Sequence, residues 1–346
     1  MPDLHCKISE GLWQALQRHQ ATTGEPLGHI IRAALAEYLQ VSHSTLFQVS
    51  TSVALVQGVY QGAVRVGTLR EHGDHGLGTF ENIDGEMVVV DGRFFQVRSD
   101  GSVHEVADDV LSPFAVITRF MPHDTIHMEQ CPDLARMAEA FDRLRPSDNF
   151  FFAVRVDGPF DYVKTRAMCK TAEGVPLAVA ASQQPEFEFE HIAGTLVGFW
   201  TPEYAKTLNI PGYHLHFLSH DHQRGGHLLQ CRGRQLRLQI QQEGALSIAL
   251  PETEDFLKAD LRQDPSADLE KAETTAEDNI RGPRCDPSPL YALYTIWAEM
   301  RTVKVSVSPG RSTRRLLSTP RFCRLKPSVG QVYGSIQMAR LGAGGV

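Results

Sequence analysis

Residues 212–227 of the chain read Gly-Tyr-His-Leu-His-Phe-Leu-Ser-His-Asp-His-Gln-Arg-Gly-Gly-His. In an extended strand alternate side chains point to the same face, so His214 and His216 project together. Leu215 and Phe217 then face the opposite side, which we expect to be buried. The stretch therefore predicts a strand with two imidazoles on one face and core residues on the other.

A third histidine follows a turn signal. Gly225 and Gly226 supply the permissive backbone of a tight reversal, after which the chain can return antiparallel and place His227 beside the first pair. Three imidazoles on one hairpin face, with no thiolate, are typical of a catalytic zinc site with an open fourth position. The alternative is that they are partly buried sheet residues. Zinc on three histidines serves hydration, hydrolysis and carbanion chemistry, so the spacing alone does not identify the reaction.

Composition places the chain among ordinary globular proteins, because 42% of its 346 residues are hydrophobic and 22% are charged. No apolar run reaches about 18 residues, so we expect no transmembrane helix. The N-terminus lacks a basic region followed by an apolar one, so no secretory signal is expected. The six cysteines show no short paired spacing, which indicates reduced thiols in a cytoplasmic protein.

Charge divides the chain unevenly. Residues 280–346 carry 11 Lys and Arg against two acids, a net charge of +9, and the net charge of −7 for the whole chain leaves −16 for residues 1–279. An acidic body argues against nucleic acid as the main partner. The basic segment 280–346 lacks a core pattern, and we expect it to be a disordered tail.

The N-terminal segment 1–42 predicts a short strand over Lys7 and Ile8, a helix from Glu10 capped by Ser9, and a second helix with apolar residues between positions 30 and 39. This order weakly resembles the ribbon-helix-helix family of dimeric DNA-binding modules. That family reads DNA with its strand, and the strand here offers few basic side chains. We therefore expect a helical arm used for packing or dimerisation.

The next hundred residues alternate short apolar runs with turn signals. Asp-Gly pairs at 84–85, 91–92 and 100–101 are strong hairpin signals and predict a β-meander from 78 to 104, followed by a strand over 114–117. Helical spacing predicts a helix from Leu134 to Leu144 capped by Asp133. A further hairpin is expected from strands at 150–156 and 162–167 around Asp157 and Gly158.

Two charged residues occupy strand ends in this region. Glu86 follows the first Asp-Gly turn, and Arg166 closes the run Val-Lys-Thr-Arg. Taken singly, each could be an exposed rim charge. Strand ends are also where binding groups are mounted on a rigid sheet, so both are candidate site residues.

Several motifs occur in a fixed order: Gly78-Thr79-Phe80 with Asp84-Gly85-Glu86, Val163-Lys164-Thr165-Arg166, Gly194 to Pro202, and Pro211 to Phe217 with Gly225-Gly226-His227. In these motifs, over about residues 44–279, the chain resembles the acetolactate decarboxylase family. The resemblance implies an α/β (α+β), β-rich fold of two domains with mixed β-sheets and few helices. We expect its halves at 43–170 and 171–279, the second binding zinc, and a homodimer.

The resemblance also implies the site residues. It places the zinc ligands at His214, His216 and His227, and further site residues at Glu86, Arg166, Thr79 and Glu273, with Glu270 as an alternative to Glu273. The chain departs from the family pattern in the hairpin, where it has His220 and His222. We expect both to be turn residues, although they could compete for the metal.

The activity implied is zinc-dependent decarboxylation of 2-acetolactate to acetoin and carbon dioxide through a metal-stabilised enediolate. Arg166 can hold the substrate carboxylate bidentately. Protonated Glu86 is the better proton donor, but Arg166 acting through a water stays open.

Two other functions stay open. One is a different three-histidine zinc enzyme on a β scaffold, such as a cupin-like or hydratase-like protein; a cupin would need a Glu a few residues after the His-x-His pair, and residues 217–226 contain none. The other is an acetolactate-sensing regulator whose N-terminal arm binds DNA.

Overall fold

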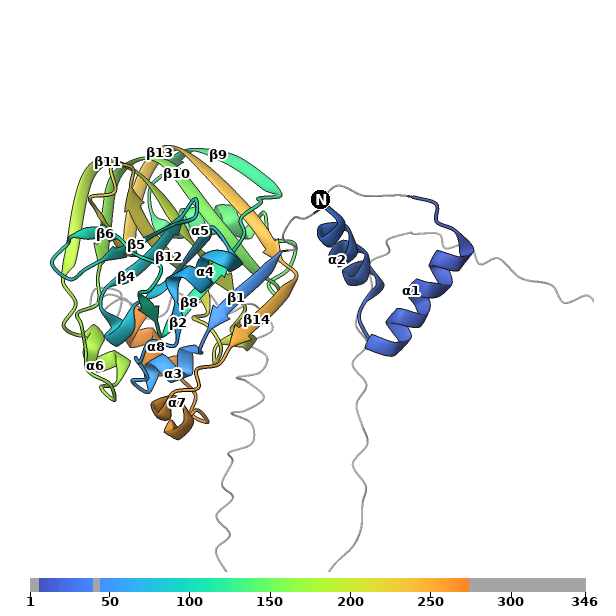
Figure 1. Cartoon of the computed structure of the whole chain (residues 1–346). Coiled ribbons are helices and arrows are strands. Elements are labelled where there is room, and N and C mark those ends of the chain that lie inside the picture. Colours follow the sequence, from blue (N-terminus) through green and yellow to red (C-terminus); the bar gives the residue numbers. More distant parts are fainter. Residues whose placement is uncertain (1–5, 40–43, 274–346) are drawn as a thin grey trace, which may run out of the picture. The chain divides into compact units, whose positions relative to one another are not determined.

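The computed structural model describes residues 6–39 and 44–273 (Figure 1). The tail expected at 280–346 lies outside these residues, and so do the side chains of residues 29 and 270–273. In the described part of the chain, no helix is long and apolar enough to cross a membrane.

The N-terminal arm consists of two helices. α1 (Glu10–Thr23) begins after Ser9, whose side chain accepts a hydrogen bond from the first turn, and α2 (Leu27–Leu39) follows a short connection. Both helices were predicted and are confirmed. The strand expected over Lys7 and Ile8 is wrong, because residues 6–9 form no regular structure and serve as the lead-in to the Ser9 cap.

One sheet has seven strands. Its order is β14 (Ala245–Ala249), β1 (Thr45–Val49), β8 (Phe114–Thr118), β3 (His75–Thr79), β4 (Glu86–Val90), β5 (Arg93–Val97) and β6 (Val103–Glu105). β1 and β14 are parallel and all other neighbours are antiparallel. The predicted meander is confirmed as β3 to β6. The glycine of each Asp-Gly turn has a positive φ, of 83° at Gly85, 77° at Gly92 and 82° at Gly101, which a side chain disfavours.

The other sheet has five strands. Its order is β10 (Phe151–Arg166), β11 (Glu186–Thr201), β12 (Gly212–Ser219), β13 (Gly225–Glu243) and β9 (Asp124–Cys131). β10 also pairs with β13, so four of these strands close into a ring. Each sheet combines strands from both sides of residue 170: β9 and β10 precede it in the second sheet, and β14 follows it in the first.

The hairpin expected around Asp157 and Gly158 is wrong. Residues 151–166 form one strand of 16 residues, and β11 pairs with it through Asp157 and Gly158 without a break. Gly158 has a φ of 152°, and the pairing with β13 shifts register beside it. The Asp-Gly pair therefore makes a local irregularity in a continuous strand.

The histidine hairpin reverses earlier than expected. The turn spans residues 220–224, between β12 and β13, and Ser219 N–H donates to Arg224 O across it. Gly225 and Gly226 already belong to β13. At Gly226, with a φ of 130°, a Cβ atom would lie 2.5 Å from Arg166 O, so this glycine is required by close strand approach and not by the turn.

The remaining elements are short. They are β2 (Val64–Arg65) paired with β7 (Leu111–Ser112), α3 (Ser52–Val56), α4 (Val66–His72), α5 (Leu134–Asp142), α6 (Leu177–Ala181), α7 (Glu254–Lys258), α8 (Ser266–Glu273) and the 3₁₀ turns Glu81–Ile83 and Glu203–Ala205. The predicted helix from Leu134 is confirmed with its Asp133 cap, which accepts from Arg136 N–H at 2.7 Å. α3, α6, α7 and α8 gather at one end of the body, at the bottom of Figure 1.

One part of the core lies between the sheets. Val88 and Val90 of β4 pack with Val197 of β11 and Leu218 of β12, and all four are buried. Leu218 shares its strand face with His214 and His216, so the histidine face of β12 is directed toward the first sheet. Leu215 and Phe217, on the opposite face, are buried, as predicted. They belong to a separate core that includes residues of α5.

Close strand approach gives a stability prediction. A Cβ atom at Gly198 of β11 would lie 2.0 Å from His214 O on the paired strand. We expect Gly198→Ala to lower the free energy of unfolding by about 1–3 kcal/mol, because the backbone must shift. Thermal and urea unfolding measure this. Gly11→Ala is the matched control, since a Cβ atom there meets nothing within 4 Å and the residue lies in a helix. Equal stability of Gly198→Ala and wild type would contradict the close approach.

Candidate active site

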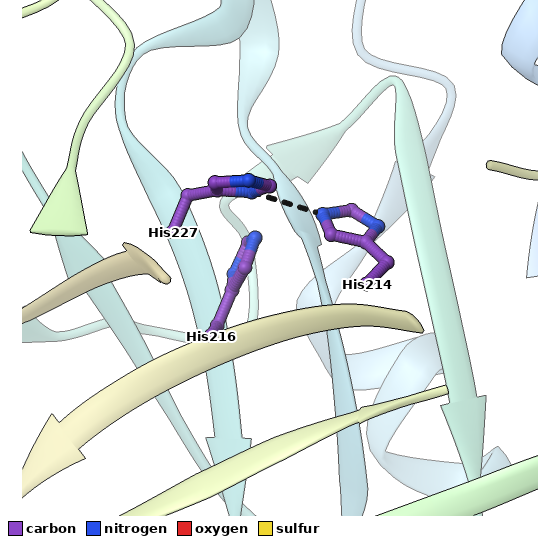
Figure 2. A group of neighbouring side chains, drawn as sticks. All are labelled: His214, His216 and His227. Atoms are coloured by element: carbon purple, nitrogen blue, oxygen red, sulfur yellow. Dashed lines mark hydrogen bonds between the residues drawn. The ribbon is translucent and has the colours of Figure 1, made fainter. Parts of the chain in front are cut away.

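Three histidines form the centre of the site. His214 and His216 lie on β12, and His227 on β13 pairs directly with His216. Figure 2 shows the three rings directed toward one another, with His214 Nε2 at 3.2 Å from His227 Nδ1. One nitrogen from each ring lies within 4.8 Å of the others. The predicted convergence of the three imidazoles is thus observed.

Hydrogen bonding fixes the tautomer of His216. Its Nδ1 lies 2.7 Å from Met87 O, and because a carbonyl only accepts, Nδ1 carries the proton and donates. Nε2 then has its lone pair toward the site. A backbone carbonyl is a usual partner for the N–H of a metal-binding imidazole.

The site is dry. His214, His216 and His227 are 8%, 1% and 7% exposed. Burial, with the Arg166 charge as a second cause, lowers the pKa of His214 to about 3. Burial likewise holds the pKa of His216 and of His227 well below the usual value. All three rings are therefore neutral near pH 7, the state that ligates a metal.

These residues fit a metal ion with nitrogen ligands. His216 Nε2 is buried and has no hydrogen-bond partner among the residues that the structure describes, and His214 presents its Nε2 to the same cluster. A buried polar atom without a partner is costly, and a cation shared by three neutral nitrogens removes that cost. Three imidazoles with no thiolate match the donor set of a catalytic zinc site.

Glu86 begins β4 and faces this centre. It is 6% exposed, its Oε1 accepts a hydrogen bond from Met168 N–H at 3.0 Å, and its Oε2 lies 3.5 Å from His216 Nε2. Thr79 lies opposite Glu86 on β3, and its hydroxyl donates to Gly85 O at 2.7 Å. Thr79 therefore stabilises the turn that presents Glu86.

Arg166 ends β10 at the same place. It pairs in register with His227 on one side and with Glu186 on the other, and it is 7% exposed. The alternative that Glu86 and Arg166 are exposed rim charges is therefore wrong. One carboxyl and one guanidinium are instead brought together with the histidines.

A cavity joins these groups. Its polar lining comprises Thr79, Glu86, Arg166, Gln184 and the three histidines. The remaining lining is mainly apolar and comprises Leu55, Gly78, Ile83, Phe114, Met168, Leu177, Ala181, Ile210 and Leu269. Sequence reasoning missed Gln184 and these apolar residues, because they come from separate segments and no spacing pattern links them.

Four other candidates lie outside the cluster or have side chains outside the described part of the chain. The backbone of Glu270 and Glu273 belongs to α8, but their side chains lie outside the described part of the chain. His220 and His222 are turn residues, as expected. The ring of His222 lies 4.7 Å from that of Phe95, away from the three-histidine cluster.

Comparison with known proteins agrees with this arrangement. The profile of the alpha-acetolactate decarboxylase family matches residues 46–263. The chain is 42% identical over 229 residues to the alpha-acetolactate decarboxylase of Methanosarcina mazei, covering 66% of this chain and 80% of that protein. It is 40% identical over 234 residues to the Bacillus licheniformis protein of the same name, covering 67% and 92%.

Solved structures show the same fold. The crystal structure of alpha-acetolactate decarboxylase from Bacillus subtilis strain 168 superposes with a TM-score of 0.65 at 36% identity, covering 67% of this chain and all of that one. The expected fold of mixed sheets with few helices is thereby confirmed. The sequence match, the shared fold and the order of the motifs together establish that this chain belongs to the alpha-acetolactate decarboxylase family.

Proposed function

We propose that the protein decarboxylates 2-acetolactate to acetoin and carbon dioxide with a zinc ion held by His214, His216 and His227. The observation that supports this most directly is the convergence of three buried, neutral histidines with Glu86 and Arg166 in one cavity, within a chain of this family. When bound, zinc supplies a Lewis acid that stabilises negative charge on substrate oxygens.

Arg166 binds the substrate carboxylate in this proposal. A guanidinium can hold a carboxylate through two parallel hydrogen bonds, which fixes the rotation of the bond that breaks. The position of Arg166 beside His227, on a rigid strand end, suits that role. When the bond between C2 and the carboxylate carbon breaks, its electron pair moves onto C2 and the adjacent carbonyl oxygen, and carbon dioxide leaves.

Glu86 returns the proton. Its Oε1 accepts from Met168 N–H, so in the protonated acid the hydrogen is carried by Oε2, the oxygen on the side of His216. Transfer of this proton to C2 gives acetoin and leaves a carboxylate, which water reprotonates before the next turnover. Arg166 acting through a water is the alternative donor.

A cytoplasmic homodimer remains a prediction. Light scattering of the purified protein tests whether it is a dimer.

Turnover is the first prediction of this proposal. Purified protein incubated with 2-acetolactate is expected to release carbon dioxide and acetoin in equal amounts, and a chelator should stop both. Restoring zinc after chelation should restore the rate, which separates metal loss from unfolding. Bound zinc without turnover, together with DNA binding, would instead favour an acetolactate-sensing regulator.

Metal content is the second prediction. Elemental analysis should find about one zinc per chain, because three neutral nitrogens converge at one point. We expect His227→Ala to lose most of it, since two nitrogens remain. His220→Ala is the matched control, an exposed histidine in the neighbouring turn, and should retain the metal. Full zinc occupancy in His227→Ala would overturn the ligand assignment.

The roles of Glu86 and Arg166 give the third prediction. Glu86→Gln and Arg166→Lys should leave zinc content nearly unchanged and lower turnover by roughly a hundredfold or more. Lysine keeps the positive charge at position 166 but lacks the planar guanidinium. The variant therefore tests whether the substrate carboxylate must be oriented and not only attracted. If Glu86 is the donor, Glu86→Gln should lose stereochemical control of acetoin more than release of carbon dioxide. Wild-type rates and unchanged acetoin chirality in both variants would refute these roles.

A further inference from the structure

Gln184 is the cavity side chain for which neither the zinc site nor the proposed proton transfer supplies a role. It lies in the connection between α6 and β11 and lines the same cavity as Arg166 and the three histidines. Thr79, another polar lining residue, already donates its hydroxyl hydrogen to Gly85 O. Apart from the three histidines, Gln184 is thus the neutral polar side chain of the cavity with hydrogen-bonding capacity left for a ligand.

The backbone around Gln184 is held against the segment that follows Arg166. Ala167 N–H donates to Pro185 O at 3.3 Å, and the Cys169 thiol donates to Gln183 O at 3.5 Å. Gln184 N–H donates to Ala181 O at the end of α6. The residue therefore has anchors on both sides in sequence. Because it precedes a proline, its own backbone is further restricted to extended conformations.

The side-chain oxygen of Gln184 lacks a donor. Its Oε1 is buried and has no hydrogen-bond partner within the ranges 6–39 and 44–273. A buried amide oxygen without a donor costs free energy, and a ligand that brings a hydrogen-bond donor to it removes that cost. A fixed backbone and an unused acceptor together indicate a ligand-binding group.

The chemistry of the substrate identifies the donor. At neutral pH the carboxylate and the ketone of 2-acetolactate are acceptors only, so its hydroxyl is the one group that can donate a hydrogen bond. We propose that Gln184 is a substrate-binding residue whose side-chain oxygen accepts a hydrogen bond from the hydroxyl of 2-acetolactate, an inference that rests on the function proposed above. Arg166 would then bind the carboxylate while Gln184 reads the hydroxyl on the same carbon.

Such a contact contributes to specificity. A site built to pair with a substrate hydroxyl discriminates against an analogue that lacks it, because the buried acceptor is then left without a partner. Gln184 would therefore help to select 2-hydroxy-3-oxo acids over simple 3-oxo acids. Its contribution is separate from any contact of the hydroxyl oxygen with the metal, since the hydrogen and the oxygen lone pairs are different sites.

A cycle of two ligands and matched variants tests this contact. The ligands lack the ketone and so cannot be decarboxylated: 2-hydroxy-2-methylbutanoate, whose hydroxyl is its one hydrogen-bond donor at neutral pH, and 2-methylbutanoate, which lacks that hydroxyl. Calorimetry on the zinc-loaded protein gives Kd for each. Removing the 2-hydroxyl also affects other contacts, but equally in wild type and variant, so the ratio of the two Kd values isolates the contact with residue 184.

We expect Gln184→Met, which keeps side-chain length but has no acceptor oxygen, to weaken binding of the ligand with the 2-hydroxyl between about threefold and tenfold. Binding of the ligand without the 2-hydroxyl should change less than about twofold. Gln184→Glu keeps an acceptor oxygen and should preserve the wild-type ratio of the two Kd values even if its charge weakens both. Gln183→Leu, an exposed neighbour outside the cavity lining, should change neither ligand.

Equal weakening of both ligands in Gln184→Met, or no change in either, overturns the proposal. If Gln184→Met lowers the melting temperature, Gln184→Glu still tests the proposal. Loss of the wild-type ratio of the two Kd values in Gln184→Glu would refute an acceptor role for residue 184. Failure of the proposed function looks different: the wild-type protein would neither turn over 2-acetolactate nor bind either ligand.

Discussion

The register of β13 at His227 is the constraint on which the site depends. His227 pairs with His216 of β12 on one side and with Arg166 of β10 on the other, so one residue position fixes the third histidine and the guanidinium together. A slip of one residue would turn His227 to the opposite face of the strand. Gly226 supports this register, because its missing Cβ lets β13 approach Arg166 O.

Burial of the three imidazoles determines their protonation state. Three imidazoles close together would repel one another if charged, and removal from water with a nearby Arg166 keeps them neutral. The same burial strengthens the interaction between charged groups. The structure thus places three neutral imidazoles in one cavity with Glu86 and Arg166.

Local signals predicted the strands that carry the site, and non-local pairing decided the rest. The three Asp-Gly turns of the meander follow their sequence signal because each flanking strand is short and ends there. Asp157-Gly158 carries the same signal, but β11 is long enough to pair across it, so the pair lies within a strand. The order of the strands within each sheet could not be predicted, because β9 and β14 pair with strands more than a hundred residues distant in sequence.

The site divides in the same way. Residues that share a strand with a motif, such as His214 and Glu86, could be found by spacing, whereas Gln184 and Leu269 reach the cavity only through the packing of α6 and α8. This division has a physical reason: side chains that must converge precisely are held best on rigid elements, and paired strands leave a periodic trace in the sequence. The groups that enclose a substrate need only reach the cavity from any element. Selectivity within such a family can therefore change through the enclosing segments while the strand pairing that holds the histidines stays the same.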